Sequence, residues 1–204
     1  MPPFLINLFA LFGGGMLVAL VILIVMLVSN AASNESKVFV ENYRKKLVST
    51  GPSPFVAGSS EEKEALERFT GFLQQIGDAD FLKKNTALAY TEDAYLNDTL
   101  VTHHGPAEIE AYFLKTSETM KSYEVTIDDS FRSGDNYYVR WTMVFAAPAL
   151  SKGEPIHSVG MSQVRFAEDG RVSFHQDFWD SGANIFGQAP VAGSVINFIR
   201  KRIQ

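Results

Sequence analysis

The chain of 204 residues contains no cysteine and only four histidines. The missing cysteines exclude disulfides, a thiolate nucleophile and cysteine-ligated metals, and their absence is compatible with either side of a membrane. Two of the histidines, His103 and His104, are adjacent. Neighbouring residues of an extended segment point to opposite sides, so this pair makes a poor chelate. We therefore expect no metal and no cofactor.

Basic residues are also scarce, because 18 lysines and arginines stand against 23 aspartates and glutamates, for a formal net charge of -5. A protein that follows a phosphate backbone needs a broad basic surface, so nucleic acid is not an expected partner. The hydrophobic share of 46% is large enough for one domain with a real core. A second full domain does not fit in the remaining length.

The N-terminal segment has no charged side chain from Met1 to Asn34. Phe4–Val28 is mainly apolar, and Met16–Val28 is an unbroken apolar run. A helix needs roughly 20 apolar residues to cross the hydrocarbon layer of a bilayer. The sequence therefore predicts a single-pass membrane anchor over residues 1–34.

The first basic residues, beginning with Lys37, come after this apolar run and none comes before it. By the positive-inside rule the rest of the chain is expected on the cytoplasmic side of an inner or plasma membrane. A cleaved signal peptide is the alternative, since Ser29–Ala32 offers small residues for cleavage. A signal peptide would also need a basic N-terminal region, which is missing. We interpret the segment as a retained anchor.

Residues 35–60 connect the anchor to the remaining chain. Apolar residues recur at a weak helical spacing over Ser36–Val48, which predicts a helix that lies at the membrane surface or is a solvated connection. Ser49–Pro54 and Gly58–Ser60 are rich in proline, glycine and serine and predict a linker. The folded domain is expected over residues 61–204.

Three helical patterns open this domain. The first begins near Ser60 with two glutamates in its first turn, where carboxylates favour the positive end of the helix dipole. The second covers Ala79–Ala89, with Leu88 among its inward residues. The third covers Ala107–Thr119 and follows a Gly-Pro pair.

Extended patterns fill most of the rest. A short piece is predicted at Tyr95–Asp98, and four longer strands follow the helices. Gly134-Asp135 and Asp169-Gly170 separate two pairs of these strands and are strong hairpin signals. Helices followed by a strand meander predict an α+β domain with helices on one face of a sheet. The four strands are Tyr123–Phe131, Asn136–Ala147, His157–Ala167 and Arg171–Trp179.

This order of elements, together with several local strings, resembles the nuclear transport factor 2-like superfamily, and in particular its SnoaL-like branch, over residues 62–204. The resemblance implies a cone-shaped α+β fold, with three N-terminal helices packed on a curved antiparallel sheet, here preceded by one transmembrane helix. The strings that carry it are Gly77–Asp80, Tyr90–Asp98, Gly105–Ile109 with Tyr112-Phe113, and His175–Asp180.

The resemblance also implies a conical cavity, the kind of concave apolar site in which small molecules bind. Asp98 falls where the ketosteroid isomerases of this superfamily keep the carboxylate that shuttles a proton. The matching first-helix region reads Phe69-Thr70, so the oxyanion-donating tyrosine of the isomerases has no counterpart there. Alternatively, Asp98 caps the turn at Asn97-Asp98-Thr99.

The last strand offers further candidates, because a period of two places His175, Asp177 and Trp179 on one face. A histidine beside a carboxylate can act as an oriented acid or base, so His175 and Asp177 join Asp98 as candidate catalytic residues. A structural pairing that holds the strands together is the alternative. An arginine-aspartate pair of the kind found in the epoxide hydrolase branch is not evident.

Several large side chains are candidates for the wall of the cavity, although aromatic stripes are also typical of a plain core. The expected occupant of the cavity is a small apolar or amphipathic molecule or a protein partner. Relatives of this fold dimerise through the sheet, so a homodimer is a further expected assembly. The candidate pocket residues are Phe69, Phe72, Tyr112, Phe113, Trp141, Met161 and Trp179.

The C-terminal tail has a turn-rich bridge at Gly187–Gly193 and then a short amphipathic helix over Ser194–Ile203. This helix is expected either on an anionic membrane surface or docked on its own domain. For the whole protein the sequence favours a membrane-anchored binding domain. The alternatives are an acid-base enzyme of the isomerase, cyclase or hydrolase type acting on a lipid-like or polyketide-like substrate, and a structural subunit of a membrane complex.

Overall fold

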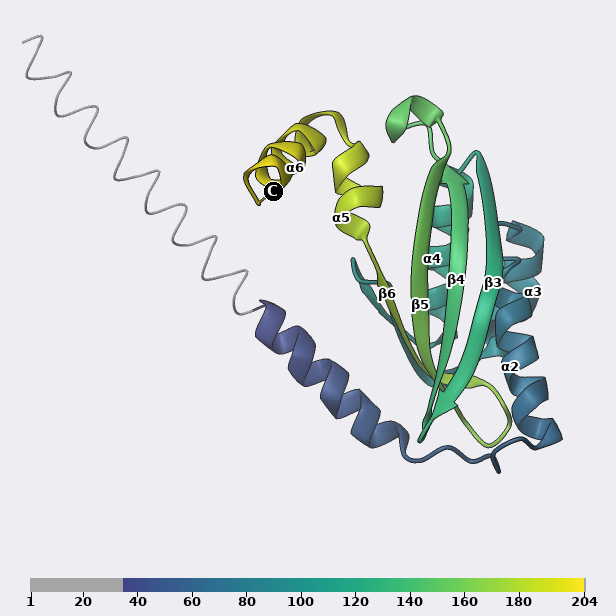
Figure 1. Ribbon diagram of the computed structural model, residues 1–204. Coiled ribbons are helices and arrows are strands. Elements are labelled where there is room, and N and C mark those ends of the chain that lie inside the picture. Colours follow the sequence, from purple (N-terminus) through teal and green to yellow (C-terminus); the bar gives the residue numbers. More distant parts are fainter. Residues whose placement is uncertain (1–34, 204) are drawn as a thin grey trace, which may run out of the picture. The chain divides into compact units, whose positions relative to one another are not determined.

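The computed structural model describes residues 35–203 (Figure 1). The predicted membrane anchor over residues 1–34 lies outside the described residues, and none of the described helices is long and apolar enough to cross a bilayer. The chain divides into two compact units between Ser49 and Thr50. The helix predicted over Ser36–Val48 is present and covers residues 35–50, of which all but the last belong to the first unit.

The second unit opens with α2 (Ser60–Leu73), α3 (Ala79–Ala89) and α4 (Gly105–Thr119). The side chain of Ser59 caps α2 by accepting a hydrogen bond from the Glu62 N–H, one residue before the predicted start. The bounds of α3 are those that the sequence predicts. Its residue Leu88, expected to point inward, is 66% exposed, so that expectation is wrong.

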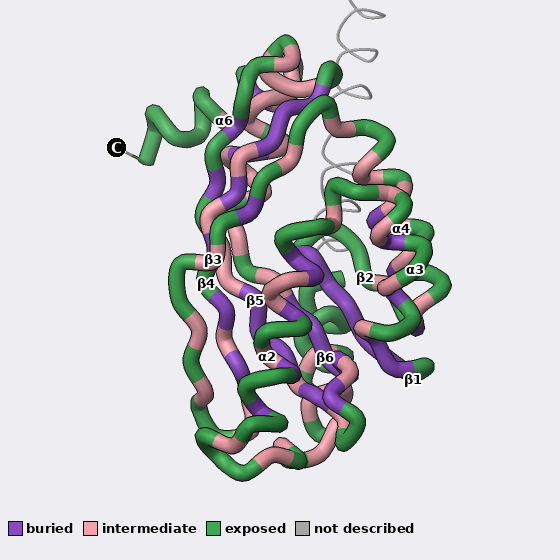
Figure 2. The backbone as a smooth tube through the Cα atoms, turned by 90° about the vertical axis from the view of Figure 1, so that its right-hand side faces the viewer, coloured by how far each residue is buried: buried purple, intermediate pink, exposed green. Residues whose placement is uncertain are grey.

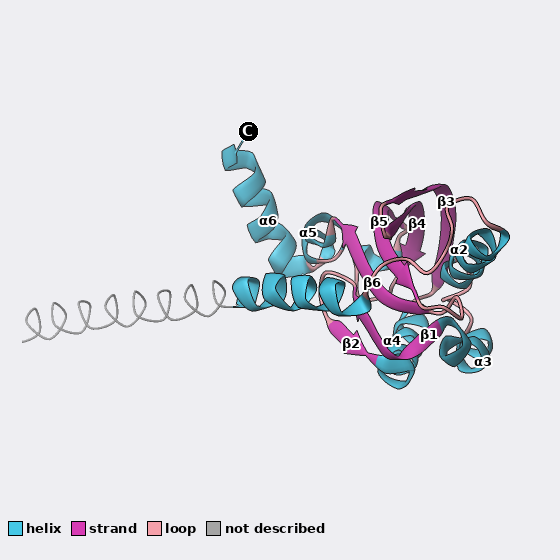
Figure 3. Cartoon of the chain, turned by 90° about the horizontal axis from the view of Figure 1, so that it is seen from below, coloured by secondary structure: helices cyan, strands magenta, loops and turns pink. Residues whose placement is uncertain are grey.

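The sheet has six strands in the order β2-β1-β6-β5-β4-β3. The neighbours from β6 to β3 pair antiparallel, as expected for a meander, but β1 pairs parallel with β6. The sheet is therefore mixed, which corrects the purely antiparallel sheet of the prediction. Figure 3 looks along the strands and shows β1 beside β6. The strands are β1 (Tyr90–Asn97), β2 (Thr102–His104), β3 (Ser122–Ser133), β4 (Asn136–Ala146), β5 (Ile156–Phe166) and β6 (Val172–Trp179).

The hairpins close where the sequence predicts them. Gly134 and Gly170 have φ angles of 59° and 78°, a left-handed conformation that glycine adopts without steric cost. A short 3-10 helix, η1 (Ser151–Gly153), connects β4 to β5. Turn chemistry of this kind sets the strand register, and with it the face to which each side chain points.

The core lies between the three helices and the face of the sheet that they cover, which we call the inner face (Figure 1). Phe69, Phe72 and Ile109 come from the helices and meet Val139 and Val164 of the strands, and all five are at most 2% exposed. Each such side chain contributes about 1.5–3 kcal/mol through burial. Figure 2 shows the buried residues concentrated along β1, β6 and the central strands.

The stretch before α2, predicted to be a linker, is held on the folded domain. The Arg165 guanidinium donates to the Gly51 carbonyl at 2.8 Å, and the Ser53 hydroxyl lies 2.7 Å from the Tyr137 hydroxyl. The Phe55 ring packs on Phe166, with ring centroids 6.1 Å apart. Residues 51–55 therefore form an extended strap on the domain.

Glu62 supports this strap indirectly, through Arg132 and Tyr137, which form hydrogen bonds with the strap. Its carboxylate accepts hydrogen bonds from the Gly58 N–H at 2.5 Å, the Arg132 guanidinium at 2.8 Å and the Tyr137 hydroxyl at 2.9 Å. Burial alone would raise the pKa of Glu62, but these hydrogen bonds and the charge of Arg132 outweigh it and hold the pKa below its ordinary value.

The chain ends in α5 (Ser181–Asn184), the 3-10 helix η2 (Phe186–Gln188) and α6 (Pro190–Ile203). The sequence predicts a turn-rich bridge as far as Gly193. The helix begins earlier, at Pro190, because a proline suits the first turn of a helix, where its missing N–H has no partner to lose. α5 is fixed by the Asn184 side-chain amide, which donates to the Ser158 hydroxyl at 2.8 Å.

Candidate functional site

A cavity of about 300 Å³ lies between the inner face of the sheet and α4. Its wall is mainly aromatic and aliphatic, and no lysine or arginine of the described chain lines it. The polar groups come from the β1–β2 turn, from β5 and β6, and from hydroxyls on α4 and β3. The aromatic lining residues are Tyr112, Phe113, Tyr123, Trp141, Phe145 and Trp179, and the acidic ones are Asp98 and Asp177.

Asp98 stands in the turn after β1 and is 7% exposed. Its Oδ1 accepts the N–H groups of Leu100 and Val101, both at 2.9 Å, and its Oδ2 accepts the Tyr112 hydroxyl. Thr99 in the same turn has a φ of 79°, an uncommon conformation for a β-branched residue. Asp98 therefore caps its turn, as one of the two expectations had it, and it also lines the cavity. Its role as a proton-shuttling carboxylate stays a prediction.

Tyr112 connects Asp98 to helix α4. Burial raises the pKa of its hydroxyl, and the Asp98 carboxylate raises it further. The hydroxyl therefore stays protonated at neutral pH and acts as a hydrogen-bond donor. The ring of His103 stacks on Tyr112 with centroids 4.5 Å apart. This stacking fixes the ring that donates to Asp98.

Asp177 is the second carboxylate of the cavity. Its Oδ1 accepts the Ser162 hydroxyl at 2.5 Å and lies 2.8 Å from His175 Nε2. Its Oδ2 accepts no hydrogen bond from the described chain, and 17% of the side chain is exposed. Because Asp177 lines the cavity, it offers a free carboxylate oxygen to a bound molecule.

His175 holds Asp177 in place. It is 1% exposed, and its Nδ1 lies 2.9 Å from the Tyr90 hydroxyl. A neutral ring with the proton on Nε2 satisfies both contacts, since Nε2–H then donates to Asp177 and Nδ1 accepts from Tyr90. The Phe69 ring packs edge-on against the imidazole at 5.0 Å. With both nitrogens engaged, His175 positions Asp177 and is not itself free to contact a ligand.

The charge of Asp177 acts on two tyrosines, the buried Tyr90 and the partly buried Tyr123. Burial raises the pKa of Tyr90 and of Tyr123, and in both cases the Asp177 carboxylate adds to the increase. The Tyr123 hydroxyl makes no hydrogen bond to the described chain, and the residue lines the cavity. It therefore provides a second neutral donor there.

Trp141 completes the polar side of the site. Its Nε1–H donates to the Ser162 hydroxyl at 3.0 Å, and that hydroxyl in turn donates to Asp177. Across the cavity, the Trp179 Nε1–H donates to the Asp98 carbonyl at 2.6 Å. Both indoles therefore orient groups next to a carboxylate.

The structure brings the three candidate catalytic residues, Asp98, His175 and Asp177, to one cavity. Of the seven predicted pocket residues, Tyr112, Phe113, Trp141 and Trp179 line it. Phe69, Phe72 and Met161 do not, which corrects their assignment.

The physical reasons differ among the three. Phe69 and Phe72 are each 2% exposed and fill the core behind the cavity wall. Met161 pairs with Phe178, while its neighbour Ser162 pairs with Asp177 on the inner face. Since successive strand residues alternate, Met161 points to the opposite, outer face.

Sequence reasoning missed the roles of Tyr90 and Ser162. A signal for Ser162 was available, because Ser158, Gly160 and Ser162 place small residues at every second position of β5. Such a stripe predicts that a large side chain of the neighbouring strand lies over it, and this side chain is Trp141. For Tyr90 no local signal exists, since its partner His175 is distant in the sequence.

A mixed six-stranded sheet, with helices over one face and a small cavity between them, defines the cone-shaped α+β domains of the nuclear transport factor 2-like kind. The profile of the SnoaL-like domain family matches residues 70–175. The chain therefore belongs to the SnoaL-like domain family. No curated protein sequence matches it significantly.

Solved structures agree with this fold. A protein assigned as a SnoaL-like polyketide cyclase from Jannaschia Sp. CCS1 has a TM-score of 0.54 at 18% identity and covers 67% of this chain and 99% of its own. A protein assigned as an isomerase from Bacillus subtilis has a TM-score of 0.52 at 20% identity, with 64% and 98% covered. A protein with a ketosteroid isomerase-like fold from Catenulispora acidiphila, in complex with trimethylamine, has a TM-score of 0.52 at 15% identity, with 60% and 92% covered.

Proposed function

We propose that this SnoaL-like domain binds a small, mainly apolar molecule in its cavity, with the polar end of that molecule donating to Asp177. The observation that carries the proposal is the free Oδ2 of Asp177 in a mainly aromatic and aliphatic enclosure. Sites of this composition bind small molecules, and a few placed polar groups set the orientation of the ligand. A volume of about 300 Å³ favours a compact ligand.

The charge of the cavity favours a ligand whose polar end is a donor or a cation. Two carboxylates line the described wall, and no lysine or arginine balances them. Only Oδ1 of Asp177 is hydrogen-bonded by the described chain, and a protonated amine would supply a donor to Oδ2. Trp141 and Trp179 add aromatic faces that attract such a cation. The related protein from Catenulispora acidiphila was solved with an amine, trimethylamine, which supports this choice.

The test uses the two tryptophans of the sequence, both of which line the cavity. Their fluorescence is followed while the full-length protein is titrated with dimethylcyclohexylamine, and separately with cyclohexanecarboxylate. A saturable change is expected with the amine, a much weaker one with the carboxylate, and loss of the amine response in Asp177→Asn. Asp128→Asn, an exposed aspartate on β3, is the matched control and should respond like the wild type. An amine response unchanged in Asp177→Asn would contradict the proposal.

A second candidate function, acid-base catalysis, is favoured by the way Asp177 is held. Ser162 and His175 fix one oxygen of Asp177, and Tyr90 fixes His175, which is the kind of support that an oriented general base requires. Asp177 would take a proton from a carbon next to a carbonyl and return it to another carbon of the same molecule. The neutral hydroxyl of Tyr123 would donate to the carbonyl oxygen meanwhile, since the Tyr112 hydroxyl already donates to Asp98.

This assignment moves the base from Asp98 to Asp177, because three hydrogen bonds already occupy Asp98. The test of Asp177 as the base is the exchange of cyclohexenone hydrogens for deuterium in heavy water, which is monitored by NMR. The exchange should be lost in Asp177→Asn and retained in Asp98→Asn, where an amide oxygen can still cap the turn. Absence of any exchange by the wild-type protein counts against catalysis and leaves binding as the function.

We also propose, from the sequence of residues 1–34, that the domain is tethered to an inner or plasma membrane and faces the cytoplasm. The support is the uncharged apolar segment and the basic residues that follow it. Protease protection in closed membrane vesicles tests the orientation. Cleavage of the domain from the cytoplasmic side alone is expected.

A further inference from the structure

Helix α6 leaves a large apolar surface uncovered. Val195, Phe198, Ile199 and Ile203 are between 48% and 80% exposed. Their spacing of three, four and eight residues from Val195 places them on one side of the helix. Figure 2 shows the second half of α6 in the colour of exposed residues.

The helix contacts the rest of the domain near its beginning. Gly193 approaches Gly187 of η2 so closely that an added Cβ would stand 2.4 Å from the Gly187 carbonyl oxygen. Gly193 is buried, whereas every residue from Asn197 to Ile203 is exposed. Docking on its own domain, the second of the two expectations for this helix, thus buries only its first turn, and the exposed second half adds one ion pair from Arg200 to Asp180.

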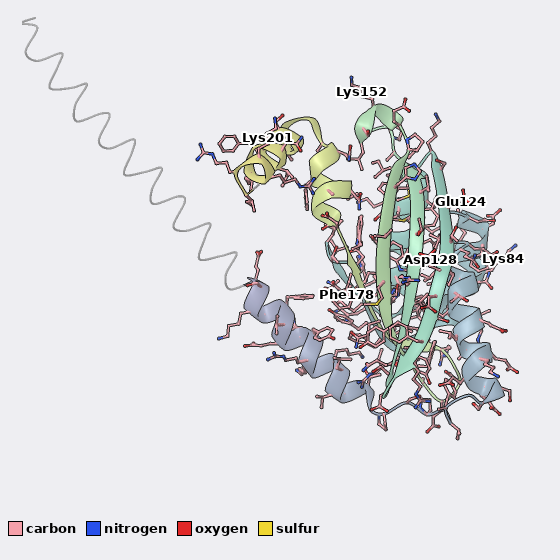
Figure 4. All side chains as sticks on the ribbon, viewed as in Figure 1. Lys84, Glu124, Asp128, Lys152, Phe178 and Lys201 are labelled. Carbon is pink, nitrogen blue, oxygen red and sulfur yellow. The ribbon has the colours of Figure 1, made fainter. Side chains whose placement is uncertain are left out.

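The charge of α6 is opposite to that of the whole chain. The helix has no acidic residue and carries Arg200, Lys201 and Arg202 in its last turn, whereas the chain has a net charge of -5. Arg200 contacts Asp180 at 3.5 Å, and Arg202 stacks on the Phe198 ring at 4.9 Å. Figure 4 shows Lys201 on α6, away from the strands of the sheet.

From these observations we infer that α6 lies on an anionic lipid surface. The apolar side enters the boundary between headgroups and acyl chains, and the cations of the last turn contact the headgroups. A helix with an exposed apolar side, a basic end and no acidic residue is suited to such a surface. The inference is independent of the cavity and of its ligand.

The experiment uses full-length protein in vesicles and takes advantage of the absence of cysteine. Val195→Cys places one environment-sensitive fluorophore on the apolar side of α6, and Asn197→Cys places the same fluorophore on the opposite side. Because the predicted anchor would hold either variant in any vesicle, the readout is local, namely the emission maximum and the quenching by iodide. The vesicles are phosphatidylcholine with or without about one third phosphatidylglycerol.

With phosphatidylglycerol present, the label at position 195 should shift to the blue and be quenched severalfold less, while the label at 197 changes little. The triple variant Arg200→Gln, Lys201→Gln, Arg202→Gln should return the label at 195 to its value in phosphatidylcholine. Equal quenching of both labels in both vesicles would overturn the inference. The inference would also be overturned if the label at 195 were protected from iodide equally in both kinds of vesicle and in detergent. Such protection would indicate a contact with protein.

Discussion

The indole of Trp141 occupies the space above Gly160, its partner on the neighbouring strand, where any side chain would otherwise stand. A Cβ added at Gly160 would lie 2.2 Å from Cη2 of the indole. This close approach lets Trp141 line the cavity and donate to Ser162 at the same time. The glycine is needed for its small size, since its φ angle is ordinary.

Gly160→Ala is therefore expected to displace Trp141 and to destabilise the domain by about 1–3 kcal/mol, as overpacking does in other cores. Urea unfolding measures the loss, and the tryptophan emission of the folded protein should change with it. Gly71→Ala is the control, because Gly71 lies in α2 with open space around it. That change should stabilise the domain by about 0.5–1 kcal/mol.

Tyr90→Phe removes the donor to His175 Nδ1 and leaves a buried nitrogen without a partner. We expect a loss of stability of about 1–3 kcal/mol. The imidazole should also become less well oriented toward Asp177, which nitrogen-15 NMR detects as a mixture of ring tautomers. Tyr138→Phe, on the outer face of β4, should leave both measurements unchanged.

Glu62 makes the stability of the domain depend on acid pH. Its pKa is lower in the folded protein than in the unfolded chain, so its contribution is fully present above the unfolded value of about 4.3 and is lost as the pH falls through the folded value. Glu62→Gln should lower stability by about 1–3 kcal/mol at neutral pH and reduce the slope of stability below about pH 4. Denaturant unfolding across this range, with the exposed Glu64→Gln as control, measures both effects. An unchanged acid slope would mean that the strap is held without Glu62.

The outer face of the sheet is the surface on which we predict a homodimer. Val159 and Phe178 are 70% and 43% exposed there, and Figure 4 shows Phe178 on β6. Analytical ultracentrifugation of the detergent-solubilised protein should show dimers that Val159→Lys converts to monomers. Lys152→Glu, in η1 outside the strands, should leave the dimer intact. A monomeric wild-type protein would exclude this assembly.

Local signals explain why much of the fold was predictable. The helix over Ala79–Ala89 begins at Asp78, whose side chain caps it, and both hairpins carry a glycine at the left-handed position. The alternation on β6 correctly placed His175 and Asp177 together on the cavity side. Signals of this kind depend on residues close in sequence, so one sequence suffices to find them.

The parts that could not be predicted depend on distant residues. The parallel pairing of β1 with β6 has no local signature, and without it nothing places Asp98 beside Asp177. The assignment of Met161 to the cavity was wrong. A shift of one residue in the register of a strand moves every side chain to the opposite face of the sheet. The strap was expected to be a linker because its proline and serine residues are turn formers. Its partners Arg132, Tyr137 and Arg165 lie far along the chain.

The β1–β6 pairing also orders events during synthesis of the protein. Asn97 pairs with Gln176, so β1 leaves the ribosome long before its partner strand exists. Until then the edge of β1 that faces β6 has no partner, and unpaired strand edges are the kind of surface that chaperones protect. Contacts between such distant segments also slow folding. The two carboxylates of the cavity therefore meet only when β6 joins the sheet. A chain truncated before Val172 would retain α2, α3 and α4 and both hairpin signals but would lack His175 and Asp177.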